Sequence, residues 1–213
     1  MGPTRSSSIP FAILNACKLA RKGQNVHTLH PDIEKILISE DQLHACCVEM
    51  GKSITRDYAH VGGDIVVVSV LRGAAIFMSD LVREIDLPLE MDYMAISSYG
   101  SGTTSSGVIR VLKDITTDIR GKHVIIAEDI IDSGLTLQYT IQHLQAYGPA
   151  SVEVASLLRK LRDDQPDIDA RYVGFEIPDA FVVGYGLDYA ERYRNLPYLG
   201  ILKPQVYGAL NKY

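Results

Sequence analysis

The segment 123–141 constrains the fold more than any other part of this chain. It opens with an apolar run rich in β-branched residues, Val124 to Ile126, which predicts a strand buried on both faces. Two adjacent carboxylates, Glu128 and Asp129, end the predicted strand, and a short turn leads into a helical pattern of apolar residues over 137–144. A buried strand that leads through a turn into a helix is typical of an α/β sheet with ligands at the strands' carboxyl ends.

The turn itself, Asp132-Ser133-Gly134-Leu135-Thr136, predicts an anion cradle. Backbone N–H groups at a helix N-terminus point at a phosphate, Gly134 lets the backbone approach closely, and the Ser133 and Thr136 hydroxyls add donors. Phosphate alone would not favour three carboxylates beside it. A ribose, whose hydroxyls are donors, and a magnesium ion both would.

The rest of the chain alternates apolar strands with helices. Ser39 to Gln42 is a capping-box pattern that predicts the start of a helix over about 40–58. A second helix is expected over 74–85, and further strands over 64–70, 89–97, 108–112, 152–158, 172–175, 181–183 and 198–202. We therefore expect one mostly parallel α/β domain over residues 31–213, with residues 1–30 as a mobile extension because they lack sustained periodicity.

The composition of the chain limits which kinds of partner and which cellular location we expect. The formal net charge of −5 over 213 residues argues against a nucleic-acid binder, which usually carries a basic stripe. No stretch approaches the roughly 20 apolar residues of a membrane span. Cys17, Cys46 and Cys47 include no C-x-x-C pair, and adjacent cysteines are a poor disulfide geometry, so we expect a reducing, cytoplasmic location.

Five ordered motifs carry a family resemblance: Leu71 to Ala74, Ser97 to Gly107, Glu128 to Thr136, Ala155 to Lys160 and Gly174 to Tyr189. With them the chain resembles the type I phosphoribosyltransferases, in particular the bacterial hypoxanthine-guanine (6-oxopurine) branch, from about Asp32 to the C-terminus. The resemblance implies a mostly parallel sheet flanked by helices, a small hood assembled from both chain ends, and a homodimer or homotetramer.

The resemblance also implies a site for phosphoribosyl pyrophosphate. Residues 132–136 would hold the 5′-phosphate, while Glu128 and Asp129 would face the ribose hydroxyls and Mg²⁺. Asp132 would lie beside N7 of the purine as the general base. The residues alone leave open that Asp132 only caps the turn.

Two further loops are implied to act at the pyrophosphate end. Backbone N–H groups of Arg72 and Gly73 would hold the leaving group, in a loop whose peptide bond is sometimes cis in relatives, and Arg194 would reach the pyrophosphate. Many family members have lysine where this chain has Arg72, and we expect function to survive because backbone groups bind there. Ser98 and Tyr99 would begin a lid that extends to Gly107 and excludes water from the reaction.

The purine site is implied by the last two motifs. Lys160 would donate to the 6-oxo group, Phe181 would stack on the base, and the backbone that begins at Val182 would contact its far edge. Asp188 would contact a metal ion through a water molecule, and it would also contact the base. Because an ammonium group has only donors, adenine would be rejected.

The expected activity is therefore Mg²⁺-dependent transfer of the phosphoribosyl group to hypoxanthine or guanine, giving IMP or GMP and pyrophosphate in purine salvage. Two alternatives remain open from the sequence. One is a non-catalytic nucleotide sensor on the same fold; the acidic net charge and the intact Asp132 disfavour it. The other is a phosphoribosyltransferase for a different base, a pyrimidine or xanthine.

Overall fold

A computed structural model describes residues 28–99, 108–162 and 168–208 of the chain. Nearly all of the expected N-terminal extension, and residues 100–107 of the expected lid, lie outside these described residues.

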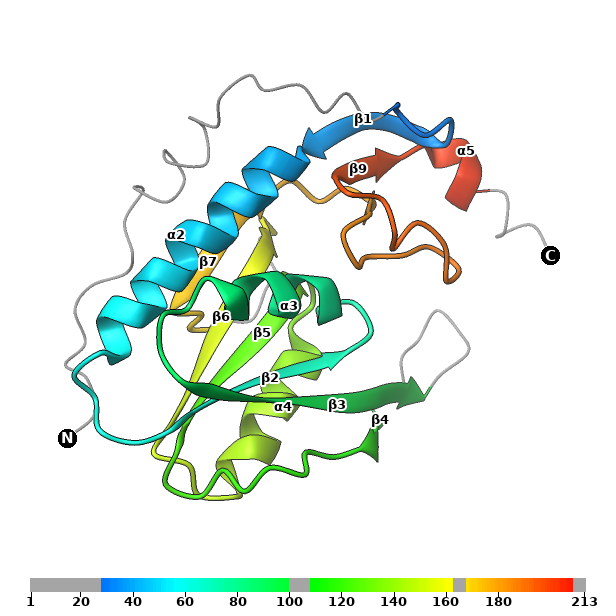
Figure 1. Ribbon diagram of the computed structural model, residues 1–213. Coiled ribbons are helices and arrows are strands. Elements are labelled where there is room, and N and C mark those ends of the chain that lie inside the picture. The colour runs from blue at the N-terminus through cyan, green and yellow to red at the C-terminus, as the bar shows by residue number, and fades with distance from the viewer. Residues whose placement is uncertain (1–27, 100–107, 163–167, 209–213) are drawn as a thin grey trace.

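Six strands form the central sheet, in the spatial order β4-β3-β2-β5-β6-β7 (Figure 1). Their bounds are β2 (Ile65–Leu71), β3 (Leu89–Tyr99), β4 (Val108–Lys113), β5 (His123–Ile131), β6 (Ser151–Lys160) and β7 (Tyr172–Ile177). All neighbouring pairs are parallel except β3 with β4, so the expected mostly parallel sheet is confirmed. The chain passes from β2 to β3 on one side and from β5 to β6 on the other, which places the topological switch point between β2 and β5.

Helices cover both faces of this sheet. The helices α2 (Glu40–Tyr58) and α3 (Ala75–Arg83) pack on one face, and α4 (Leu135–Gln145) packs on the other. The predicted capping box starts α2: the Gln42 N–H donates to Ser39 Oγ at 3.3 Å, and the Ser39 N–H donates to Gln42 Oε1 at 2.9 Å. No helix among the described residues is both long and apolar enough to cross a membrane.

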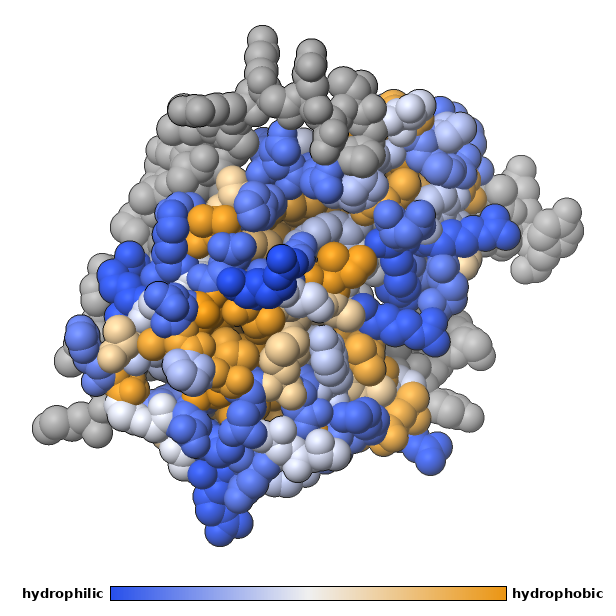
Figure 2. Space-filling view, in the orientation of Figure 1, coloured by the Kyte–Doolittle hydropathy of each residue, from blue (hydrophilic) through white to orange (hydrophobic). Residues whose placement is uncertain are grey.

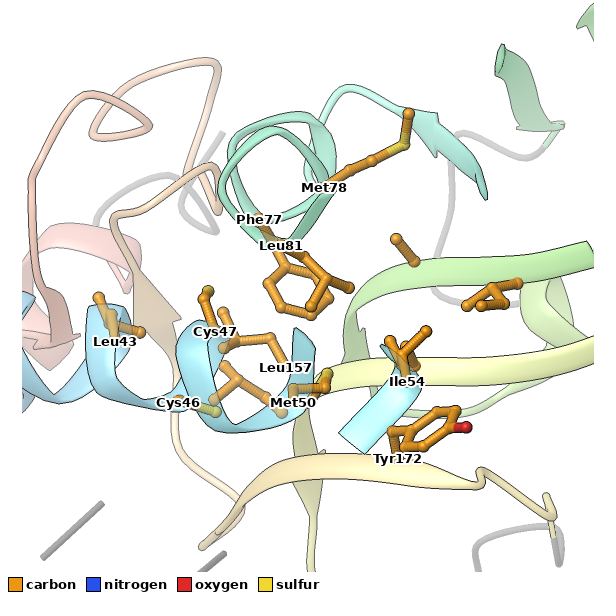
Figure 3. Close-up of a cluster of buried hydrophobic side chains, with 14 of the residues drawn as sticks. Leu43, Cys46, Cys47, Met50, Ile54, Phe77, Met78, Leu81, Leu157 and Tyr172 are labelled. Atoms are coloured by element: carbon orange, nitrogen blue, oxygen red, sulfur yellow. The ribbon is translucent and has the colours of Figure 1, made fainter. Parts of the chain in front are cut away.

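The strand β2 shows why the central strands have apolar residues at successive positions instead of at every second one. Val67 belongs to the core cluster under α2 and α3, whereas Val66 and Val68 belong to the cluster under α4. Successive side chains therefore enter different cores, and a strand buried on both faces needs apolar residues at every position. Figure 3 shows the first cluster, in which Met50 of α2 and Phe77 of α3 approach the sheet from the helix layer.

A second, three-stranded sheet forms a hood. It has the order β1 (Ile33–Ile38), β9 (Leu199–Leu202) and β8 (Val182–Val183), all antiparallel, and the short helix α5 (Pro204–Tyr207) follows it. The hood thus joins segments from opposite ends of the chain, as expected, and lies on the side toward which β2 and β6 run (Figure 1). Residues 184–198, which connect β8 to β9, are called the hood loop below.

Sequence patterns missed β1 and α5. The pairing of β1 with β9 is irregular between Ile33 and Lys35 and again between Ile36 and Ile38, so buried residues do not alternate with period two. A helix of four residues, as α5 is, is too short to show a periodic pattern.

Several predicted boundaries differ from those of the structure, and three of these differences bear on the site. The strand β5 does not end at Glu128 and Asp129 but continues to Ile131, because its pairing with β6 extends that far. Ser98 and Tyr99 lie within β3 and pair with β4 rather than opening a loop. Phe181 precedes β8 instead of starting it.

The contact between α2 and α3 gives a stability prediction. A Cβ added at Gly51 would lie 2.5 Å from the Glu84 carbonyl oxygen and 2.6 Å from its carbon, so the backbone would have to move. We expect Gly51→Ala to lower the free energy of unfolding by about 1–3 kcal/mol. Gly62→Ala is the matched control, because a Cβ there meets nothing within 4 Å. Denaturant unfolding of both variants tests this, and equal stability would contradict the packing argument.

Candidate active site

The candidate site lies where β2, β5 and β6 end at the same edge of the sheet. Parallel pairing aligns Ser69 of β2 with Ala127 of β5, and Ala127 with Ala155 of β6. The residues that follow each aligned position therefore emerge side by side. The loop after β2, the acidic end of β5 and Lys160, the last residue of β6, come together in this way.

Glu128 and Asp129 form an acidic pair inside β5, each partly buried. Burial, and then the charge of Asp129, raises the pKa of Glu128 well above its ordinary value. Burial also raises the pKa of Asp129, and a backbone hydrogen bond from Ile130 at 2.8 Å and the charge of Arg194 only partly offset it. The ionised pair is therefore unfavourable without a cation or a hydroxyl-bearing ligand.

Gly73 lets the loop after β2 approach this pair. A Cβ at Gly73 would overlap Asp129 Oδ2, so no other residue fits without moving the carboxylate. The Leu71–Arg72 peptide bond, one residue earlier, is cis, the isomer that some relatives have in this loop. Gly186 of the hood loop, at φ +102°, packs in turn on the carbonyl oxygen of Gly73.

The predicted anion cradle follows β5. Gly134 adopts φ +72° in the left-handed region and is the N-cap of α4, so no side chain caps the first N–H groups of that helix. Ser133 is exposed beside it, and Leu135 and Thr136 form the first helical turn. The cradle has the backbone arrangement that binds a phosphate.

Asp132 connects the cradle to the end of β6. Lys160 Nζ donates to Asp132 Oδ2 at 2.7 Å, and Arg162 Nη1 donates to Oδ1 at 2.8 Å. Asp179 is a second carboxylate near the same cations, 3.3 Å from Lys160 Nζ. Burial of Asp132 opposes its ionisation, but the hydrogen bonds and charges of Lys160 and Arg162 outweigh burial and hold its pKa below the ordinary value.

The hood loop places Arg194 and Asp188 near Asp129 of the acidic pair. Arg194 Nη2 lies 2.8 Å from Asp188 Oδ1, and its Nη1 donates to the Gly186 carbonyl oxygen at 2.8 Å. Glu191 also binds Arg194, at 3.1 Å, and accepts from Arg72 Nη1 at 2.6 Å. The charges of both Arg194 and Asp188 act on Asp129. Arg194, expected at the pyrophosphate, and Asp188, expected at the metal ion and the base, therefore both lie near the acidic pair.

Phe181 is 40% exposed and belongs to an aromatic group in the hood. Its ring stacks on Tyr207 with centroids 5.1 Å apart, and Tyr189 meets it edge-on at 5.4 Å. Val182 is buried in β8, with its backbone paired to Ile201 of β9. The predicted stacking residue is thus partly exposed and packs against two other aromatic rings of the hood.

The structure thus places the predicted residues of β5, β6 and the hood loop around one edge of the sheet, although the side chains of Ser98 and Tyr99 lie outside the described part. Sequence reasoning missed Gly186, Arg162, Asp179 and Glu191. No local pattern identifies them, because each acquires its role through a partner at least 19 positions away in the sequence.

The acidic pair and Asp188 offer the oxygen donors that Mg²⁺ prefers. Across residues 28–99, 108–162 and 168–208, no group of three or more histidine, cysteine or acidic side chains could hold a metal ion without help. Mg²⁺ keeps several waters and takes only one or two carboxylates plus substrate phosphates, so this donor set fits it. Burial raises the pKa values of Glu128 and Asp129, and a bound cation would lower them again by favouring the ionised carboxylates.

Glu128 gives a stability prediction. Between the ordinary glutamate pKa and the raised folded value, the folded state holds more protons than the unfolded state, so the free energy of unfolding falls as pH rises. Without Mg²⁺ at pH 7, we expect Glu128→Gln to stabilise the protein by on the order of 1 kcal/mol, or about 2–4 °C in Tm. The gain should shrink at pH 5. Calorimetry beside the exposed Glu34→Gln control checks this, and a lower Tm for Glu128→Gln at pH 7 would refute it.

Comparison with known proteins agrees with this geometry. Residues 41–190 match the model of the phosphoribosyl transferase domain. The hypoxanthine-guanine phosphoribosyltransferase of Bacillus subtilis (strain 168) is 51% identical over 176 residues, which are 83% of this chain and 97% of that protein. A crystal structure of a hypoxanthine phosphoribosyltransferase from Staphylococcus aureus is 45% identical, with a TM-score of 0.80 over 86% of this chain and 99% of that one.

Some relatives are longer. The bifunctional protein TilS/HprT of Listeria monocytogenes (strain F2365) is 50% identical over 180 residues, but the match spans only 28% of that protein. The similarity nevertheless covers 84% of this chain. With the sheet, the hood and the acidic edge in place, the chain belongs to the phosphoribosyltransferase family, in its hypoxanthine-guanine branch.

Proposed function

We propose that this protein transfers the phosphoribosyl group of phosphoribosyl pyrophosphate to hypoxanthine or guanine, giving IMP or GMP and pyrophosphate in purine salvage. The observation that carries the proposal is the Lys160–Asp132 contact at the end of β6, beside the cradle. Its ammonium donor and carboxylate acceptor lie next to each other. The 6-oxo group and the N7–H group of a 6-oxopurine are their adjacent complements.

The sugar phosphate would lie along β5 and the start of α4. The first N–H groups of α4, freed by Gly134, would bind the 5′-phosphate. Glu128 and Asp129 would accept hydrogen bonds from the ribose hydroxyls, which are stronger when the acceptor is ionised. Arg72, Gly73 and Arg194 would bind the pyrophosphate.

Asp132 would act as the general base. Bond formation to the purine requires loss of a purine proton, and Asp132 would accept that proton at N7 while Lys160 donates to the 6-oxo group. The low pKa that Lys160 and Arg162 give to Asp132 keeps it ionised before the base binds. Phe181 would stack on the purine, and backbone groups from Val182 onward would contact its far edge.

We propose Mg²⁺ as the cofactor, held by Glu128, Asp129 and Asp188 together with substrate oxygens. When bound, it would supply positive charge that neutralises the leaving pyrophosphate. Without it these carboxylates would repel the substrate. Ser98, Tyr99 and the residues up to Gly107 would exclude water during the transfer.

We also propose that residues 31–213 act as one domain in a cytoplasmic homodimer or homotetramer. Support for self-association comes from apolar side chains on the face that carries α3. Ile76 of α3 is 37% exposed and Met91 of β3 is 42% exposed, and Figure 2 shows apolar residues gathered near the middle of this face.

One assay separates this proposal from its alternatives. Initial rates with hypoxanthine, guanine, xanthine, adenine and uracil identify the base, and xanthine must be included because it too presents a 6-oxo group. A protein that binds these ligands without turning over any of them would instead be a sensor.

Replacing Asp132 tests the general base. We expect Asp132→Asn to lower kcat by about 10²–10⁴ with little change in the KM for phosphoribosyl pyrophosphate, because the amide keeps the turn but accepts no proton. Asp179→Asn is the matched control, since it removes the other carboxylate beside Lys160, and its effect should stay below about tenfold. Near-normal kcat in Asp132→Asn would rule out the assignment.

Replacing Lys160 tests base recognition. Adenine should be rejected far more strongly than hypoxanthine is distinguished from guanine, because a buried donor without an acceptor costs up to about 10⁴–10⁵ in specificity. We expect Lys160→Met to reduce the difference in kcat/KM between the oxopurines and adenine, mainly by lowering kcat/KM for the oxopurines. The measurement is kcat/KM for all three bases with both proteins. If the wild type used adenine as well as hypoxanthine, the role of Lys160 would be wrong.

A further inference from the structure

Two arginines from separate loops converge on one carboxylate oxygen. Arg72 Nη1 lies 2.6 Å from Glu191 Oε2, and Arg194 Nη2 lies 3.1 Å from the same atom. Guanidinium groups present several donors in a fixed plane and suit carboxylates and phosphates. The two side chains therefore form an anion-binding pair. Glu191 is the carboxylate that they share, while Arg194 also pairs with Asp188 at 2.8 Å.

The backbone of the hood loop holds Glu191 in this place. The Glu191 N–H donates to Asp188 Oδ2 at 2.9 Å. Ala190 and Glu191 adopt φ +51° and +63°, a left-handed conformation that residues with side chains seldom adopt. Gly186 packs on the carbonyl oxygen of Gly73, which keeps the hood loop beside the loop that carries Arg72.

A ligand anion can nevertheless replace Glu191 at the two arginines. The side chains of Arg72 and Glu191 are 69% and 64% exposed, so water screens their attraction and the ion pair contributes little to folding. A pyrophosphate group carries more charge than one carboxylate and offers more acceptor oxygens to the same two arginines. It would therefore compete well with Glu191.

We propose that Glu191 occupies the place of the pyrophosphate group between Arg72 and Arg194, and that its displacement sets the affinity for pyrophosphate and its esters. This inference rests on the proposed function, through the assignment of the Arg72 backbone and of Arg194 to the pyrophosphate end of the substrate, and it adds the side chain of Arg72 to that assignment. It makes Glu191 a residue that weakens binding of the leaving group instead of one that supports it.

Binding measurements on the full chain with Mg²⁺ test the inference. We expect Glu191→Gln to lower the Kd for inorganic pyrophosphate and for phosphoribosyl pyrophosphate about 2- to 10-fold, since one or two exposed ion pairs no longer compete. The Kd for IMP, which lacks the pyrophosphate, should stay unchanged. A merely structural role for Glu191 would weaken all three ligands together.

Three further variants separate the effect of the Glu191 charge at this place from other effects of the substitution. Glu34→Gln, at an exposed position of β1, removes the same charge elsewhere and should leave all three Kd values unchanged. Glu191→Asp keeps the charge on a shorter side chain and should give an intermediate affinity. In a protein that already carries Arg72→Met, Glu191→Gln should give a smaller gain, because one of the contested arginines is gone.

The outcomes separate the two proposals. If the wild type binds phosphoribosyl pyrophosphate but both Glu191 variants bind pyrophosphate equally or more weakly, the inference is overturned and the proposed function stands. If the wild type binds neither phosphoribosyl pyrophosphate nor IMP, the proposed function fails and the inference fails with it.

Discussion

Parallel pairing of β2, β5 and β6 is the constraint on which the site depends. It sends the carboxyl ends of three strands to one edge of the sheet, where a cis peptide, an acidic pair and a lysine come together from distant parts of the sequence. The pairing in turn requires helices on both faces, because a strand such as β2 has no polar face to expose. The double layer of helices and the position of the site therefore have the same origin.

Three carboxylates within five residues illustrate how the fold assigns different roles to the same chemical group. Glu128 and Asp129 lie inside a strand, where burial disfavours their charged forms. Asp132, just beyond the strand, receives hydrogen bonds from Lys160 and Arg162 and stays ionised. An acid pair whose ionised form favours a cation thus lies three residues before a carboxylate that stays ionised.

The hood completes the site by approaching the central sheet very closely. Gly73 and Gly186 are contact points: one lies against Asp129, and the other lies against Gly73 itself. Such contacts leave no room for side chains, so the loop after β2 and the hood loop together fix the distance between the acidic pair and Arg194. Charged groups of β5 and of the hood loop are thereby held close enough to influence one another.

The sequence by itself determined the elements whose signals are local. The apolar run of β5, the capping box at Ser39 and the glycine turn before α4 each depend on neighbouring residues, and each formed as predicted apart from the strand's end. The motif around Asp132 likewise predicted a phosphate cradle, and together with the other four motifs it indicated the family that the comparisons show. Only the tertiary structure decided the irregular strand β1 and the partners of Glu191, Arg162 and Gly186. These features arise from contacts between distant segments, and no spacing within one segment records which distant residue will face it.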